Sequence, residues 1–151
     1  MLFGVLSAHG RSRRNLASAF IGEIVAAMDS LEECAQIKQL ARTRTGGNEI
    51  PIDFHDFDLP RFAVYEANAS QLGLFNPPLP RELAYFYTRL GALPKRLRGL
   101  TSPASISEEE ARRRTQDALD DVARTMQLGE DLLRSIKEFV SNKQPHSISR
   151  A

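Results

Sequence analysis

The residues best suited to chemistry lie in the acidic segment 53–58. Carboxylates and an imidazole are donor groups that divalent ions prefer, so Asp53, His55, Asp56 and Asp58 are weak candidates for a metal site. The spacing is not that of an EF-hand loop, because the turn glycine and the glutamate at the twelfth position are missing. A solvated acidic loop explains the composition better, and we assign no metal and no cofactor.

Tyr65 and Asn68 are the second pair of interest. An amide among apolar helical residues needs hydrogen-bond partners if it is buried. We therefore predict that Asn68 bonds a short helix to a long one and that both residues form a structural or interaction site. A ligand contact is the alternative interpretation.

Patterns typical of catalysis are missing from the sequence, which has no G-x-S-x-G, P-loop, G-x-G-x-x-G or H-E-x-x-H motif. We predict no catalytic residue and no enzymatic activity. Cys34 is the only cysteine, which excludes an intramolecular disulfide, and its place on an apolar helix face predicts a buried, inert thiol.

The charge pattern argues against nucleic-acid binding. The net charge is +1, and the basic run 112–114 follows the acidic run 108–110 at a spacing that pairs the two on one helix. The run 95–98 lacks matching acids in its own segment, but it also lacks the interleaved aromatics of a nucleic-acid surface.

Two long helices must position all these residues. Over 12–44, apolar or small residues recur at steps of three and four, with Lys38 as an interruption, at Ala17, Phe20, Ile24, Ala27, Leu31, Cys34 and Ala41. Over 107–142 the same steps continue at Thr115, Leu119, Val122, Met126, Gly129, Leu133, Ile136 and Val140. Such heptad patterns predict long packed helices. Gly129 on the second pattern predicts a close crossing with a bulky neighbour.

Between the long helices the sequence predicts two shorter ones. One spans about 59–72 with Asp58 as its N-cap. The other starts near Pro80 and has a kink or break at 91–94 because of Pro94. Ser107 and Glu110 form a capping-box signature for the last helix. The predicted fold is all-α: two long heptad-patterned antiparallel helices with a short two-helix insert, forming a hairpin or four-helix bundle over 12–142, followed by a disordered tail at 143–151.

The N-terminal residues 1–11 form an apolar stub with arginines at its end and just beyond it: Arg11, Arg13 and Arg14. A signal peptide has the opposite order, whereas the cytoplasmic end of a transmembrane helix has this one. Three interpretations stay open: an apolar start that packs on the bundle or frays, the remnant or end of a membrane anchor, and a short interfacial anchor.

The central stretch resembles a known group of proteins. The run F-A-V-Y-E-A-N at 62–68, the L-G-L-F step at 72–75 and the F-Y pair at 86–87 are similar to those of uncharacterised bacterial helical proteins, many of which carry a single N-terminal transmembrane segment ending in arginines. The resemblance covers about residues 11–100. It implies a membrane-tethered helical domain that faces the cytoplasm, and it implies no activity.

Together these observations predict a non-enzymatic helical interaction or scaffold protein of the bacterial cytoplasm, with attachment to the inner face of the plasma membrane through the N-terminus as a finer expectation. Its partner would be an unknown protein or a second copy of the chain. The alternative is a small helical protein that binds a metal or ligand through the acidic loop 53–58.

Overall fold

The computed structural model describes residues 3–44, 54, 57–101 and 107–141, and every regular element in these ranges is helical. The α-helices are α1 (Phe3–Arg44), α2 (Ala63–Asn68), α3 (Leu79–Arg98) and α4 (Glu108–Ser141). Short 3₁₀ helices, η1 (Ala69–Leu74) and η2 (Gly99–Thr101), follow α2 and α3. The all-α prediction is confirmed, while the predicted tail 143–151 lies outside the described residues.

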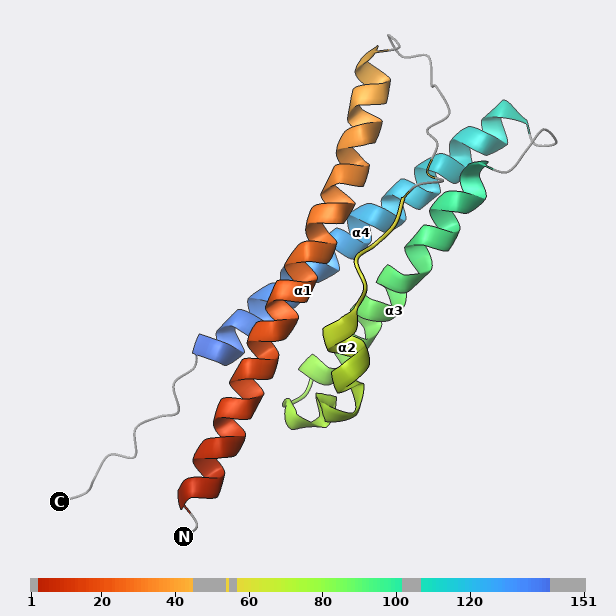
Figure 1. The fold of residues 1–151 in the computed structure, drawn as a ribbon. Coiled ribbons are helices and arrows are strands. Elements are labelled where there is room, and N and C mark those ends of the chain that lie inside the picture. The colour runs from red at the N-terminus through yellow and green to blue at the C-terminus, as the bar shows by residue number, and fades with distance from the viewer. Residues whose placement is uncertain (1–2, 45–53, 55–56, 102–106, 142–151) are drawn as a thin grey trace.

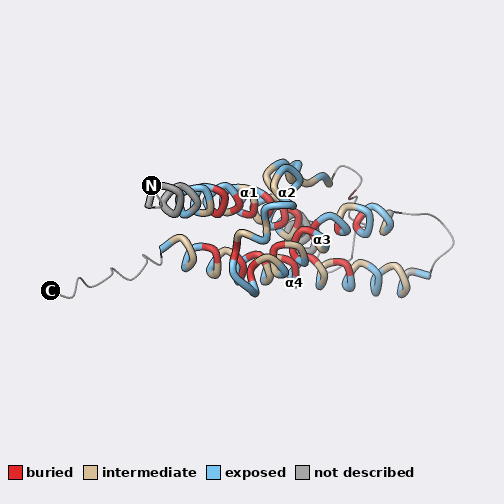
Figure 2. The backbone as a smooth tube through the Cα atoms, turned by 90° about the horizontal axis from the view of Figure 1, so that it is seen from below, coloured by how far each residue is buried: buried red, intermediate tan, exposed pale blue. Residues whose placement is uncertain are grey.

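The long helices α1 and α4 run in opposite directions and cross each other, and α3 lies antiparallel beside α4 (Figure 1). The predicted insert therefore has two different roles. Its second helix, α3, packs against α4 along much of its length, whereas α2 and η1 form a small cap beside α1 and α3. Buried residues gather where α1, α3 and α4 meet (Figure 2). The core is thus a three-helix arrangement covered at one side by the short α2.

The apolar seam of α1 is buried as its spacing predicts. Ala17, Phe20, Ile24, Ala27 and Leu31 have no exposed surface. Cys34, one turn further on, is also buried, and burial raises the pKa of its thiol to about 11. The inert, buried thiol expected from the sequence is consistent with this environment, because the reactive form is the thiolate. The helix itself begins at Phe3 rather than near Ser12.

At alternate core positions in the middle of α4, the buried residue is the one that precedes the predicted residue. Val122, Gly129 and Ile136 are buried as predicted, but Thr125 and Leu132 are buried in place of the predicted Met126 and Leu133, which are only partly buried. The physical reason is that α4 contacts both α1 and α3, so its most buried line lies between the two neighbours. The hydroxyl of Thr125 is satisfied locally, because Oγ1 donates to the Asp121 carbonyl oxygen at 2.7 Å.

Gly129 marks the close crossing that the sequence predicts. A Cβ at this position would meet the sulfur of Met28 on α1 and would lie 3.0 Å from Cε2 of Phe86 on α3. Three helices therefore approach one another at a single residue without a side chain. This prediction is confirmed, and the missing side chain is what allows the approach.

The helix α3 runs through Pro94 without ending, so a break at this position is wrong, while a kink, the other form of the prediction, stays a prediction. Leu90, Leu93 and Leu97 are buried on both sides of the proline. Burial of this continuous apolar face stabilises the helix by roughly 1.5–3 kcal/mol for each large side chain, which offsets the backbone hydrogen bond that proline cannot donate.

Opposite charges accompany the pairing of α3 with α4. The sequence of α3 contains five Lys or Arg and one Glu, a net charge of +4. The sequence of α4 contains six Lys or Arg and nine Asp or Glu, a net charge of −3.

At the start of α4, Ser107 Oγ accepts the Glu110 N–H at 3.2 Å. Hydrogen bonding to Arg114 lowers the pKa of the Glu110 carboxyl.

A polar contact fixes the N-terminal part of α1. The guanidinium of Arg13 donates to Asn76 Oδ1 at 3.2 Å and lies 5.4 Å from the ring centroid of Phe139 near the end of α4. Phe139 in turn packs edge-on against Phe75 at 5.4 Å. Arg13 thereby connects the first helix to the loop before α3 and to the last helix, at the opposite side of the core from Cys34.

Candidate functional site

Of the four predicted metal ligands, Asp58 alone lies among the described residues. Asp53, His55 and Asp56 lie outside them, so their expected role stays a prediction. Asp58 is exposed and accepts the N–H of its neighbour Leu59 at 3.0 Å. Within the described ranges, no group of three or more His, Cys, Asp or Glu side chains is arranged to hold a metal ion.

The start of α2 is capped by a residue of α1. The Glu23 carboxylate accepts the N–H groups of Val64 at 2.6 Å and Tyr65 at 3.1 Å. A carboxylate here satisfies free N–H groups and is attracted by the positive end of the helix dipole. The N-cap prediction for Asp58 is wrong, because α2 begins only at Ala63. Glu23 on α1 fulfils the capping role from another helix.

Tyr87 joins α3 to the same carboxylate. Its hydroxyl donates to Glu23 Oε2 at 2.7 Å, and its ring stacks on Tyr65 with centroids 4.2 Å apart. Phe62 and Phe20 also contact the ring. Burial, and then the neighbouring Glu23, raises the pKa of the Tyr87 phenol well above its ordinary value. Glu23, Tyr65 and Tyr87 therefore hold α1, α2 and α3 together, which is a structural role for the predicted residue Tyr65.

Asn68 acts within its own segment. Its Nδ2 donates to the Val64 carbonyl oxygen at 2.8 Å, and its Oδ1 accepts from Gln71 Nε2 at 3.2 Å. The first bond lies within α2, and the second joins α2 to η1. The bond to a long helix that we expected from Asn68 is instead made by Glu23.

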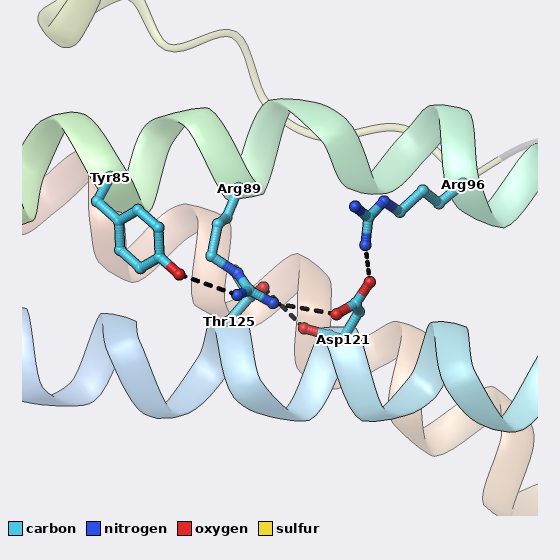
Figure 3. Close-up of polar contacts among 5 residues, drawn as sticks. All are labelled: Tyr85, Arg89, Arg96, Asp121 and Thr125. Carbon is cyan, nitrogen blue, oxygen red and sulfur yellow. Dashed lines mark hydrogen bonds and ion pairs between the residues drawn. The ribbon is translucent and has the colours of Figure 1, made fainter.

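A second polar cluster lies between α3 and α4 (Figure 3). The carboxylate of Asp121 on α4 accepts from Arg89 Nη2 at 3.1 Å and also pairs with the guanidinium of Arg96. Arg89 donates a further bond to Tyr85 Oη at 3.2 Å. The Asp121 side chain is 17% exposed, and the Arg96 side chain is 59% exposed. One carboxylate thus holds two arginines that lie two turns apart on α3.

Two cavities flank this cluster. One, of about 350 Å³, is lined at its ends by Tyr85 and Arg96. The other, of about 600 Å³, is lined by residues between Gly91 and Leu100 and by α4 residues between Arg114 and Asp121. Ala92, Arg96 and Asp121 line both cavities, so we treat them as one α3–α4 groove that runs from Tyr85 to Leu100. In Figure 3, the side chains of Arg89, Arg96 and Asp121, which line the groove, lie between α3 and α4, and α1 passes behind the two helices.

Sequence reasoning found Tyr65, but it missed the carboxylates at the centre of the two clusters, Glu23 and Asp121. The unmatched basic run 95–98 was a signal for a partner outside its own helix, and Asp121 is that partner for Arg96. Glu23 gave no comparable signal, because a glutamate beside an apolar stripe is ordinary on an amphipathic helix. Its acceptor role depends on contacts with residues 41 to 64 positions away.

Comparison with known proteins finds no match: no family model, no curated protein and no solved structure matches the chain. Among the described helices, none combines the length and the apolar character needed to cross a bilayer.

Proposed function

We propose that the protein is a non-enzymatic helical interaction protein and that the α3–α4 groove is its docking surface. The observation that carries this proposal is the groove itself, with Tyr85, at 51% exposure, among its lining residues. Tyrosine and arginine are among the residues enriched at protein interfaces. Tyr85, Arg89 and Arg96 supply both types along one face.

The chemistry of the groove supports binding. Its arginines are held by Asp121 and by the Tyr85 hydroxyl at hydrogen-bonding distances. Such mutual pairing orders a polar surface before a partner arrives, which lowers the entropy cost of association. The packed helices α3 and α4, which line the groove, are a suitable base for an interaction site.

In vivo photo-cross-linking tests this proposal. A photoreactive amino acid at Tyr85 should give a cross-linked adduct of defined mass at native expression levels. The same group at Val25, an exposed apolar position of α1, is the matched control. The Tyr85 adduct should disappear when Ala92→Trp fills the groove. Equal adducts at both positions, or none at Tyr85, would contradict the proposal.

A second part of the proposal is attachment to the cytoplasmic face of a bacterial membrane through the N-terminal end of α1. It is supported by the apolar-then-basic order and by the exposure of Arg11 and Arg14 on this helix, while Arg13 is engaged with Phe139. Fractionation of cells at native expression tests it, with Phe3→Glu/Leu6→Glu as the variant expected to lose membrane association. A wholly soluble wild-type pool would contradict it.

Metal or ligand binding by the loop 53–58 remains the alternative function. Stoichiometric metal in the purified protein would favour it, and its loss in Asp53→Asn/Asp56→Asn would assign it to this loop.

A further inference from the structure

We infer that the α3–α4 groove receives an acidic helix of a partner protein, and that a carboxylate of this helix displaces Asp121 from Arg96. This inference rests on the proposed function and names the chemistry of the partner. It is argued from the charges along the groove, from its shape and from the position of Asp121 between two arginines.

The charges that line the groove are unbalanced. Four cationic side chains face two carboxylates, and all six come from α3 and α4: Arg89, Lys95, Arg96, Arg114, Asp117 and Asp121. Complementary charge fixes the orientation of a partner and speeds its association. Arg114 is already paired with Glu110 at 2.9 Å, so Arg89, Lys95 and Arg96 against the two aspartates leave an excess of one positive charge. This excess favours an acidic partner over a neutral or basic one.

The shape of the groove fits a helix. Its wider part is lined by small residues on both sides, including Gly91, Gly99 and Ala118. A Cβ added at Gly91 or Gly99 would meet no atom within 4 Å, which means that open space lies above them. Small residues let the backbone of an incoming helix approach closely, and helix-in-groove binding is a common mode of peptide recognition.

Asp121 occupies the position that an incoming carboxylate would take. It pairs with Arg96, whose side chain is the more exposed of its two partners at 59%, against 25% for Arg89. Exchange of one carboxylate for another keeps the Arg96 guanidinium paired throughout, so no charge is left desolvated and alone. Asp121 therefore competes with the partner and reduces its affinity in the wild-type protein.

The first test identifies the segment bound in cells. Mass spectrometry of the adduct formed at Tyr85 should find an Asp- or Glu-rich segment with helical spacing of its acids. A neutral or basic segment would overturn this inference and leave the proposed function intact. A segment of this same chain would also overturn it, because the occupant would then be a second copy.

The second test measures binding with a defined probe and the full-length chain. The probe is a synthetic helix of about three heptads with Glu on one face and Leu and Ala on the other, and the control replaces every Glu by Gln. Anisotropy should show binding of the Glu peptide that weakens with salt. Asp121→Asn should tighten it by roughly three- to tenfold, and Arg96→Gln should weaken it by a similar factor.

Matched controls make the second test decisive. Arg134→Gln removes an exposed arginine of α4 that pairs with Asp131 outside the groove, and it should leave peptide binding unchanged. Circular dichroism verifies that each variant is folded. Equal binding of the Gln peptide, equal binding of a single-stranded oligonucleotide, weaker binding by Asp121→Asn, or no binding of the Glu peptide would each overturn the inference.

Discussion

Replacement of Glu23 by alanine tests the contact that joins α1, α2 and α3. The variant leaves three donors without their acceptor: the N–H groups of Val64 and Tyr65 and the hydroxyl of Tyr87. A buried donor without a partner costs about 1–3 kcal/mol, but Val64 and Tyr65 are only half-buried, so water compensates in part. We expect a loss of about 2–4 kcal/mol in the free energy of unfolding.

Urea denaturation followed by far-ultraviolet circular dichroism measures this loss. The midpoint should fall while the slope of the transition stays constant, which identifies a change in stability alone. Glu23→Gln retains one acceptor oxygen and should lose less. Tyr87→Phe removes one hydrogen bond and should cost about 1 kcal/mol. The matched control is Glu33→Ala at an exposed position of α1, with an expected change within about 0.5 kcal/mol.

A double-mutant cycle separates the contact from general effects. Tyr87→Phe should cost less in the Glu23→Ala background than in the wild type, because the acceptor is already missing. The reasoning is refuted if the two changes are additive, or if Glu23→Ala destabilises no more than Glu33→Ala does.

Three further predictions follow from the core. Gly22→Ala, with open space around it, should stabilise by up to about 1 kcal/mol, whereas Gly129→Ala should not, because its Cβ would displace the Met28 side chain and would lie 3.0 Å from the buried Phe86 ring; equal urea midpoints would contradict this. Cys34, whose thiol pKa is raised to about 11 by burial, should react with a disulfide reagent at pH 8 far more slowly than in denaturant, and equal rates would show that it is accessible. The raised Tyr87 pKa means that the unfolded phenol ionises near pH 10 while the folded one stays protonated, so the stability contributed below pH 10 should fall as pH rises above it; a flat profile between pH 9 and 11 in urea titrations would count against the buried phenol.

The long helices could be predicted because their information is local. A repeat of three and four is visible within α4 itself, and it correctly places Val122, Gly129 and Ile136 in the core. The predicted core residues Met126 and Leu133 were each wrong by one position. A repeat gives the direction of an apolar face, but it does not give the number of helices that contact this face. Pro94 was misjudged for a related reason: a local penalty is offset by burial along the whole of α3.

The candidate site depended on information that no local pattern holds. The capping of α2 by Glu23 and the pairing of Asp121 with Arg89 require the register between helices. Asp58 was assigned as the cap of the neighbouring helix, and Asn68 was expected to bond a long helix, but the bonds that both form are short-range. The basic run 95–98 indicated an external partner, but the identity of Asp121 could only come from the packing of α3 on α4.

The opposed charges of α3 and α4 also bear on how the chain reaches its structure. Arg89 and Asp121 are 32 residues apart, whereas Glu23 and Tyr87 are 64 apart. Doubling the length of a loop adds only about 0.6 kcal/mol to its closure entropy, but the shorter closure also gains attraction between a basic and an acidic helix. We therefore expect the α3–α4 hairpin to form first and α1 to dock on it afterwards. In hydrogen exchange, amides of α1 should then open at lower free energy than those of the hairpin.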